Sequence, residues 1–417
     1  MKKIVYTTVL ISFLFLIINP FTYAGVMDVE KEDGYFIITN VDSIPTIDVP
    51  NVVLDNITGD LNILGGYNKV ILLQRIRLLT LSEAKAQELV GKYKAVVDKK
   101  GSTIKITGRD NIRKVSISYI LKLPKVSNIK VKAAGSDVSL IMLDGEIDVN
   151  TSGGDIESEK IGGEIFLRTS GGDIYVKDSF GDVELSTSGG DIEIENIDGD
   201  ISSHTSGGDI ICRKANGYVR ASTSGGDIKF RYCMGKRIEA RTSGGDIKID
   251  GRLKSATLRT SGGDIYVDTV NNYGEIIASG GDIIVNYSSG DLYLHTSGGD
   301  IQVKNSEGSI DAMTSGGDVE VSKLPDKDSS IKSGKITTSG GNIVFRIKPN
   351  SKATIKAEVK VRKRYRDDCG IISDFPINLS VESSGDYVVK RGTVLLNGGG
   401  NIIELKTTGG DIIIEEF

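Results

Sequence analysis

Ten aspartates at a nearly fixed spacing are the residues of this chain most suggestive of chemistry. Each ends a Thr-Ser-Gly-Gly-Asp motif or a one-residue variant of it, and eight of the nine steps between them are 18 residues, the other being 19. In stacked β-strands, equivalent residues lie about 4.8 Å apart. Two carboxylates at that distance repel by about 0.9 kcal/mol in bulk water, so such a row of charges needs compensation. The aspartates are Asp155, Asp173, Asp191, Asp209, Asp227, Asp246, Asp264, Asp282, Asp300 and Asp318.

Two kinds of compensation fit these aspartates. An Asp beside a Gly-Gly turn can accept hydrogen bonds from backbone N–H groups and from the motif Ser hydroxyl, which makes the motif a structural turn. Alternatively, calcium shared between coils would suit stacked carboxylates, as in the calcium-binding β-roll with its G-G-x-G-x-D repeat. The present motif lacks the third glycine of that repeat. The ten aspartates are therefore calcium-ligand candidates in an alternative hypothesis, and no cofactor is expected in the main one.

A polysaccharide-acting β-helix enzyme is the third hypothesis. Such enzymes build clefts from long loops, and the uniform 18-residue steps leave no room for them. His204 and His295 occupy the same coil position five coils apart, roughly 24 Å at the stacking distance, and cannot form a dyad. The ten aspartates are equivalent, so none is marked out as a general acid or base. We therefore predict no catalytic residue.

The elements that carry the aspartates are short β-strands. Apolar residues alternate after each Asp, as in Ile174 and Val176, and again nine residues later, as in Val183 and Leu185. Period-two alternation indicates half-buried strands. A second glycine follows the Asp by eight residues in seven coils, and this spacing predicts coils of strand, turn, strand, turn. The prediction is a parallel β-solenoid with two facing sheets; a three-sided cross-section with a short third face, and the handedness, stay open.

The motif residues have expected packing roles. By alternation the motif Thr points inward, where a Thr ladder could hydrogen-bond along the stack. The paired glycines are expected to supply positive φ and to leave no side chain against the neighbouring coil. Cys212 and Cys233 are one coil plus three residues apart, so they are expected at different azimuths, as buried free thiols rather than a disulfide; Cys369 is the odd third cysteine.

The flanking segments differ from the repeat, as the capping ends of a solenoid should. Residues 1–24 form a predicted signal peptide, with Lys2 and Lys3 before an apolar run and small residues at Thr22 and Ala24. Residues 25–150 are predicted as an irregular β-rich cap with one helix near 82–94, begun by Ser82. Residues 151–343 are the regular solenoid, with six residues inserted near Pro325, and residues 344–417 are a C-terminal β cap.

Composition limits the partners. The net charge is −5, with signs interspersed, and the chain has 51 Gly, 7 Pro and no Trp. The charge pattern gives no basic face for nucleic acid. No second apolar run of membrane-spanning length follows the signal peptide. The mature protein is therefore expected in the periplasm, at the cell surface or outside the cell.

Three signatures in order resemble the bacterial putative-adhesin family of β-strand-repeat proteins, a domain of unknown function. They are the segment LSEAKAQELV ahead of GSTIKITG and LKLPKV, the TSGGDI coils, and the closing NGGGNIIELKTTGGDIII. The resemblance implies a β-helical fold on exported or envelope-associated proteins, and it implies no catalytic residues. The main hypothesis is thus an exported, non-enzymatic adhesive or structural module, with surface glycans or envelope proteins as partners.

Overall fold

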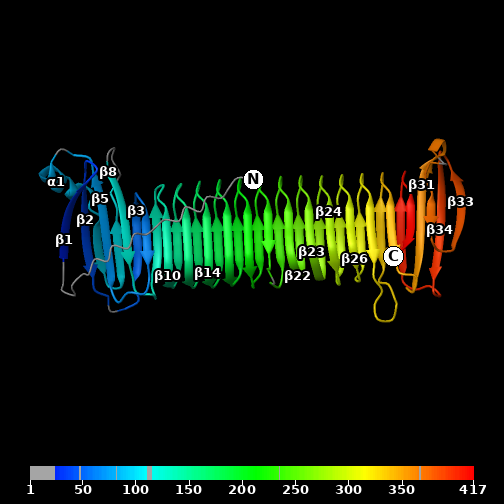
Figure 1. Ribbon diagram of the computed structural model, residues 1–417, viewed down its shortest axis with the longest axis horizontal. Coiled ribbons are helices and arrows are strands. Elements are labelled where there is room, and N and C mark those ends of the chain that lie inside the picture. Colours follow the sequence, from blue (N-terminus) through cyan, green and yellow to red (C-terminus); the bar gives the residue numbers. More distant parts are fainter. Residues whose placement is uncertain (1–23, 47, 81, 110–114, 234, 366–367) are drawn as a thin grey trace.

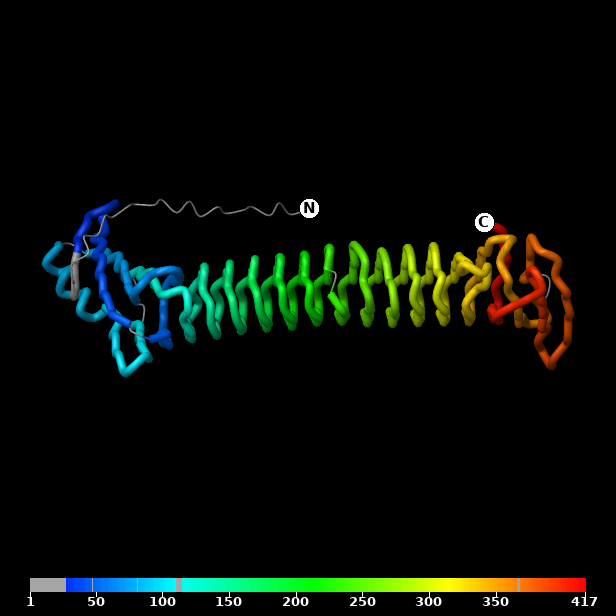
Figure 2. The backbone as a smooth tube through the Cα atoms, turned by 90° about the horizontal axis from the view of Figure 1, so that it is seen from below, coloured from blue at the N-terminus to red at the C-terminus, as the bar shows by residue number. Residues whose placement is uncertain are grey.

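The computed structural model describes residues 24–46, 48–80, 82–109, 115–233, 235–365 and 368–417. Residues 1–23 of the predicted signal peptide lie outside this set. The described chain is a long rod of stacked coils between two irregular ends (Figure 1). The tube view turned by 90° shows the same regular stacking along the rod (Figure 2). The predicted all-β solenoid is confirmed.

Each regular coil contributes one strand to each of two sheets, and every strand pairs in parallel with its equivalent in the next coil. We call the sheet built from the strands that follow the motif the motif sheet. It comprises β10 (Val138–Asp144), β12 (Ile156–Gly162), β14 (Ile174–Phe180), β16 (Ile192–Asp198), β18 (Ile210–Ala215), β20 (Ile228–Arg231), the first parts of β22 (Ile247–Arg259) and β23 (Ile265–Ile277), β24 (Ile283–Ser288), β26 (Ile301–Ser306), β28 (Val319–Lys323), β30 (Ile343–Ile347) and β36 (Ile412–Glu416).

The other strand of each coil belongs to what we call the opposite sheet. It comprises β9 (Asn128–Ala133), β11 (Ile147–Asn150), β13 (Ile165–Arg168), β15 (Val183–Ser186), β17 (Ile201–His204), β19 (Val219–Ser222), β21 (Ile238–Arg241), the last parts of β22 and β23, β25 (Asp291–His295), β27 (Ile310–Met313), β29 (Gly334–Thr338) and β35 (Ile402–Thr407). Ile, Val and Leu side chains from both sheets fill the space between them. The repeat thus buries a continuous core that no single coil could form alone.

The coil also has a short third side. Motif strands turn at a residue with positive φ five positions after the Asp, such as Lys160 (φ 57) and Asn196 (φ 57). The next residue then points inward, and its row contains Ile161, Ser179, Ile197, Ala215 and Cys233, all buried. Ile161 and Gly162 still pair in register with the preceding coil. The cross-section therefore has two long sides and one short paired side.

The 18-residue register begins before the first complete motif. Val138 of β10 pairs with Ile156, and Ile147 of β11 pairs with Ile165, in the same offset as the later coils. Two strands that precede the helix, β3 (Asn51–Ile57) and β4 (Leu61–Leu64), pair in parallel with β9 and β10 and form a further coil.

The N-terminal end closes the stack with antiparallel strands and the predicted helix. These strands are β1 (Ala24–Glu32), β2 (Tyr35–Ile44), β5 (Val70–Leu78), β6 (Val96–Lys100), β7 (Thr103–Thr107) and β8 (Val115–Lys122). The helix α1 (Glu83–Tyr93) begins at Ser82, whose side chain accepts a hydrogen bond from the Lys85 N–H. It buries Ala86, Val90 and Tyr93 against β2 and β5.

The C-terminal end is built out of sequence order. After β30 the chain forms β31 (Ala353–Arg362), a short 3-10 turn (Lys363–Tyr365), β32 (Ile371–Ser373), and the antiparallel pair β33 (Ile377–Ser384) and β34 (Tyr387–Leu396). It then returns, so that β35 lies between β29 and β31, and β36 lies between β30 and β32. Figure 1 shows these last strands, in red, between the yellow coils and the orange end.

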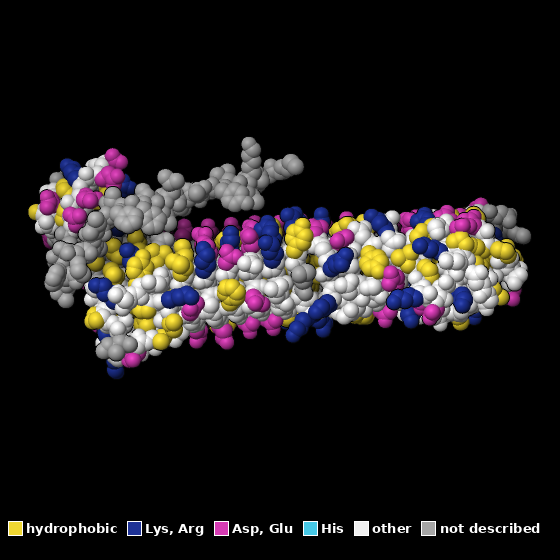
Figure 3. All heavy atoms as spheres, turned by 60° about the horizontal axis from the view of Figure 1, so that its bottom comes forward, with side chains coloured by type: hydrophobic (Ala, Val, Ile, Leu, Met, Phe, Trp, Pro, Cys, Tyr) yellow, Lys and Arg dark blue, Asp and Glu magenta, His cyan; other side chains and the backbone are white. Residues whose placement is uncertain are grey.

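The surface of the rod carries both charges. Figure 3 shows a row of acidic side chains along the lower edge of the visible face in its N-terminal half, giving way to Lys and Arg side chains near the middle. In the part of the chain that the structure describes, no helix is long and apolar enough to cross a membrane.

Candidate functional site

The motif aspartates form a ladder that is bonded from coil to coil. The backbone N–H of each motif Asp donates to Oδ1 of the Asp in the preceding coil. The N–H of Asp191 lies 2.7 Å from Oδ1 of Asp173, and the N–H of Asp246 lies 2.9 Å from Oδ1 of Asp227 despite the 19-residue step. The other steps from Asp155 to Asp318 measure 2.7 to 2.8 Å. In nine of the ten carboxylates, Oδ1 therefore accepts a hydrogen bond from the backbone N–H of the next motif Asp. In the tenth, Asp318, Oδ1 accepts from the N–H of Asn342.

The ladder is longer than the ten motif copies. Asp137 accepts from the N–H of Asp155 at 3.0 Å, and Asp318 accepts from the N–H of Asn342 at 2.6 Å. Asn342 then accepts from Asp411 at 2.9 Å, and Asp411 accepts from the N–H of Gly370 at 2.6 Å. The sequence interpretation did not include Asp137, because Gly135-Ser136 stands before it in place of Gly-Gly. Its distance of 18 residues from Asp155 is the signal that could have identified it as a member of the ladder.

Protonation of the ladder depends on local contacts. Burial raises the pKa of Asp173; the N–H of Asp191 opposes this, and the charges of Asp155 and Asp191 add to the rise. Burial also acts on Asp227, but the N–H of Asp246 and the ammonium of Lys229 outweigh it and lower the pKa of that carboxyl. Lys229 Nζ lies 3.0 Å from Asp227 Oδ2 and 4.0 Å from Asp209 Oδ2. Side chains thus neutralise the aspartate charges only at some coils, whereas the hydrogen bonds from backbone N–H groups to the carboxylates continue along the whole ladder.

The motif threonines point inward, and their hydroxyls bond to glycines rather than to one another. The hydroxyl of Thr187 donates to the carbonyl of Gly172 in the preceding coil at 2.9 Å and accepts from the N–H of Gly190 in its own motif at 3.3 Å. The same pair of contacts recurs at Thr205. Among the residues that the structure describes, no motif Ser hydroxyl donates a hydrogen bond to a motif Asp. The prediction that these hydroxyls help to compensate the aspartate charges is therefore wrong.

The two motif glycines have different surroundings. A Cβ on the second one, Gly190, would lie 2.0 Å from the carbonyl oxygen of Gly172, whereas a Cβ on the first, Gly189, would lie 3.6 Å from that of Gly171. Neither residue has a φ in the left-handed region, so the expectation of positive φ is wrong for the motif. Close approach between coils, rather than backbone conformation, therefore requires the second glycine.

A shorter ladder of the same kind occurs at the turn before the opposite sheet. Asp182 accepts from the N–H of Asp200 at 2.9 Å, and Asp200 accepts from the N–H of Tyr218 at 2.8 Å. Asp291 accepts likewise from Ser309 at 2.8 Å. Both turns of the coil thus use a carboxylate to receive the amide of the next coil.

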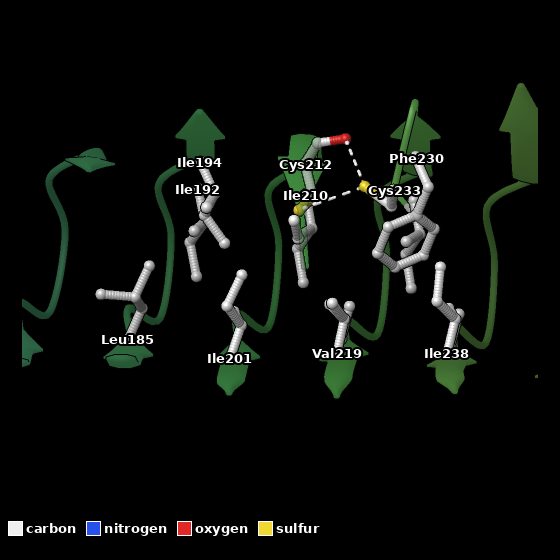
Figure 4. Packing of buried hydrophobic residues seen from close by; sticks show 14 of the residues in the cluster. Leu185, Ile192, Ile194, Ile201, Ile210, Cys212, Val219, Phe230, Cys233 and Ile238 are labelled. Atoms are coloured by element: carbon white, nitrogen blue, oxygen red, sulfur yellow. Dashed lines mark hydrogen bonds between the residues drawn. The ribbon is translucent and has the colours of Figure 1, made fainter. Parts of the chain in front are cut away.

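Cys212 and Cys233 meet inside the rod, so the expected difference in azimuth is wrong. Their Sγ atoms are 3.6 Å apart, both side chains are buried, and both are free thiols. Tyr232 (φ 56) turns the chain and points Cys233 inward in the short third row. Figure 4 shows the two sulfur atoms facing each other among Ile210, Phe230 and Val219. Contact with Cys233 and burial raise the pKa of the Cys212 thiol, while Cys369 lies apart and half-buried.

The two histidines are not brought together. His204 lies at the end of β17, where its Nδ1 is 2.9 Å from the Ser222 hydroxyl, and His295 lies at the end of β25.

The described residues contain no group of three or more His, Cys, Asp or Glu side chains that could hold a metal ion. The calcium hypothesis stays a prediction, which thermal melts in calcium and in EDTA would test.

Lys323 is a buried cation that the sequence interpretation missed. Its side chain is fully buried at the end of β28, just before the inserted loop. Nζ donates to the Gly308 carbonyl and lies 3.5 Å from the Ser306 hydroxyl. Burial lowers the pKa of Lys323 to about 8, opposed by the charges of Asp291 and Glu307.

The surface hollows of the rod are shallow, and three of them lie on the opposite sheet. One of about 490 Å³ lies beside Tyr273 and Tyr293. A second, of about 380 Å³, lies beside Phe166 and Tyr218 and carries several carboxylates. A third, of about 490 Å³, is lined by Arg220, Arg241 and Arg259 together with Ser and Thr hydroxyls.

Comparison with solved structures gives distant similarities. A putative adhesin from Parabacteroides merdae ATCC 43184 is 14% identical, with 64% of this chain and 95% of that chain covered and a TM-score of 0.30. A putative cell adhesion protein from Clostridium sporogenes ATCC 15579 is 9% identical, with 91% and 99% covered and a TM-score of 0.16. A putative adhesin from Bacteroides fragilis NCTC 9343 is 10% identical, with 91% and 97% covered and a TM-score of 0.16.

The family comparison is more direct. No curated protein matches this chain. The model of the Toastrack DUF4097 family matches residues 86–330 and 235–362. These two matches together span most of the helix, the repeat coils and the first strand of the C-terminal end, which is well over half of the sequence. The chain therefore belongs to the Toastrack DUF4097 family.

Proposed function

We propose that this protein is an exported, non-catalytic adhesive rod that presents the outward side chains of its two sheets to surface glycans or envelope proteins. The proposal rests on the uniformity of the coils along the rod. Along the regular stack, each coil repeats the same two strands and the same bonded turns. Such a scaffold sets outward residues at a fixed spacing of about 4.8 Å along a straight surface.

The shape of the surface supports binding rather than catalysis. Enzyme pockets are concave and enclose most of a small substrate, whereas the hollows described above are open depressions on a sheet. The names of the distant structural neighbours, which are described as putative adhesins, agree with this function but add no weight to it.

Cell fractionation combined with surface proteolysis tests the proposal. We expect the protein in the exported fraction, cut by protease added to intact cells, and we expect beads coated with the purified protein to retain cells or envelope fragments. Retention of the protein inside the cytoplasm would end the proposal. Beads that retain nothing, with the protein exposed at the surface, would also count against adhesion.

A further inference from the structure

The arginine-lined hollow on the opposite sheet has a charge arrangement that the fold does not require. Two outward columns of side chains cross it. One runs His204, Ser222, Arg241 and Arg259 in successive coils, and the other runs Ser202, Arg220, Glu239 and Thr257. Like charges directly opposite each other on neighbouring strands are destabilising. Arg241 and Arg259 are paired in this way.

The neighbouring carboxylates compensate only part of this charge. Glu239 is shared by two guanidinium groups, with Arg220 at 3.7 Å and Arg237 at 2.9 Å. Arg259 pairs with Glu275 of the next coil. Arg241, which is exposed, has no ion pair with any residue in the described ranges. The hollow therefore carries an excess of positive charge centred on Arg241.

We propose that this hollow binds a carboxylate of an acidic polysaccharide, with Arg241 as the principal contact. The planar guanidinium group matches a carboxylate in a two-point hydrogen bond. Arg259 lies beside it, and the hydroxyls of Ser202, Ser222 and Thr257 line the same hollow, where they can bond sugar hydroxyls. This inference rests on the proposed adhesive function and names the chemistry of its partner.

The charges around the hollow select a polymer with widely spaced anionic groups. Toward the N-terminal end the adjoining hollow is lined by Asp182, Glu184 and Asp200, and toward the C-terminal end Glu275 follows Thr257 in the next coil. A dense polyanion such as duplex DNA would meet these carboxylates on either side of Arg241 and be repelled. A polysaccharide that alternates uronic acid with neutral sugar units places one carboxylate in the hollow and hydroxyls over its flanks.

The test is binding of the purified full chain to an alternating uronic-acid polysaccharide of the hyaluronan type, with neutral dextran and duplex DNA as comparison ligands. We expect binding to the uronic-acid polymer only, weakening as salt is raised. Arg241→Gln should weaken it by roughly tenfold, the scale of a lost charge-assisted contact. Lys304→Gln removes the same charge from an exposed position in β26 on the motif sheet and should change affinity less than about twofold.

The outcomes separate this inference from the proposed function. Equal affinity of both variants, or equal binding to DNA, overturns the carboxylate site. A rod that is surface-exposed and retains cells, but does not bind the uronic-acid polymer, also overturns the site and leaves adhesion standing. Unchanged thermal unfolding of Arg241→Gln is expected because the side chain is exposed, and it shows that any lost binding is not lost folding.

Discussion

At the scale of single residues, the two glycines of each motif differ in what they can tolerate. Replacing Gly190 by Ala would place a Cβ 2.0 Å from the Gly172 carbonyl, so the two coils must separate. We expect a loss of roughly 1–3 kcal/mol in the free energy of unfolding, as for other overpacked sites. Gly189→Ala has room at 3.6 Å and should change stability by less than about 1 kcal/mol.

Urea denaturation of both glycine variants measures this difference. The pair is a matched control, because the substitution is the same at neighbouring positions of one motif. Equal losses in the two variants would contradict the steric account and would point instead to a conformational requirement shared by both glycines.

Lys323 should give the rod an unusual dependence on pH. Its pKa is about 8 in the folded protein, because burial penalises the ammonium form, against about 10.4 for an unperturbed lysine. The unfolded chain thus binds more protons between these values, so stability rises with pH from about 8 to about 10.4. The gain is ~3 kcal/mol at most, at 1.36 kcal/mol per pKa unit.

Unfolding midpoints across this pH range test the effect by comparison with Lys323→Met. The variant should be more stable at pH 7 and should lack the rise, since its side chain carries no charge. Lys332→Met, at an exposed position nearby, should keep the rise. Parallel stability curves for the protein and Lys323→Met would show that the burial of Lys323 has no such cost.

At the scale of elements, alternation in the sequence predicted the long sides of the coil but not the short one. Residues one and three after each Asp alternate as in an extended strand, so rows such as Ile174 and Val176 were identified. The residue five after the Asp takes positive φ in several coils, and this breaks the alternation and turns the sixth inward. For that reason Cys233 was placed away from Cys212. Lys323 is buried for a different reason: it lies five residues after Asp318, and a register shift places it beside Ser306, the sixth residue of the preceding coil.

The C-terminal elements show another limit of sequence patterns. The closing TTGGD motif indicated a degenerate copy of the coil, and Thr407 and Asp411 do make the motif contacts. Nothing local in the sequence indicates that the chain returns to place β35 between β29 and β31 and β36 between β30 and β32, because strand order depends on long-range pairing. The helix at Glu83–Tyr93, by contrast, was predictable from its cap and spacing.

The C-terminal end should keep the rod from associating through its last coil. Removing residues 348–417 deletes β31 to β36 and leaves the edges of β29 and β30 unpaired. Exposed strand edges pair with other chains. We therefore expect the shortened chain to form dimers and larger species at micromolar concentration while the full chain does not, as measured by size exclusion with light scattering. A shortened chain that stays monomeric would show that this end has no protective role.

At the scale of the whole molecule, the repeat makes the rod nearly one-dimensional. Each coil contacts its two neighbours, so stability is approximately a sum over coils and over the interfaces between them. The ladders fit this view, since each amide contact between motif aspartates and each bond from a motif Thr hydroxyl to a Gly carbonyl joins adjacent coils. A rod of this kind should accept the loss of a whole coil more readily than the loss of part of one.

Excising residues 192–209 tests this, because it joins Asp191 to Ile210 and restores an 18-residue step to Asp227. We expect a folded rod shorter by about 4.8 Å, with both ends intact and a small fall in melting temperature from the lost interface. Excising only residues 192–200 joins Asp191 to Ile201 and places an opposite-sheet strand in the motif sheet, so the ladders after that point fall out of register. That variant should unfold at a much lower temperature. Maximum dimension by small-angle X-ray scattering and thermal melts distinguish the two, and equal tolerance of both deletions would mean that the bonded ladders do not set the register of the stack.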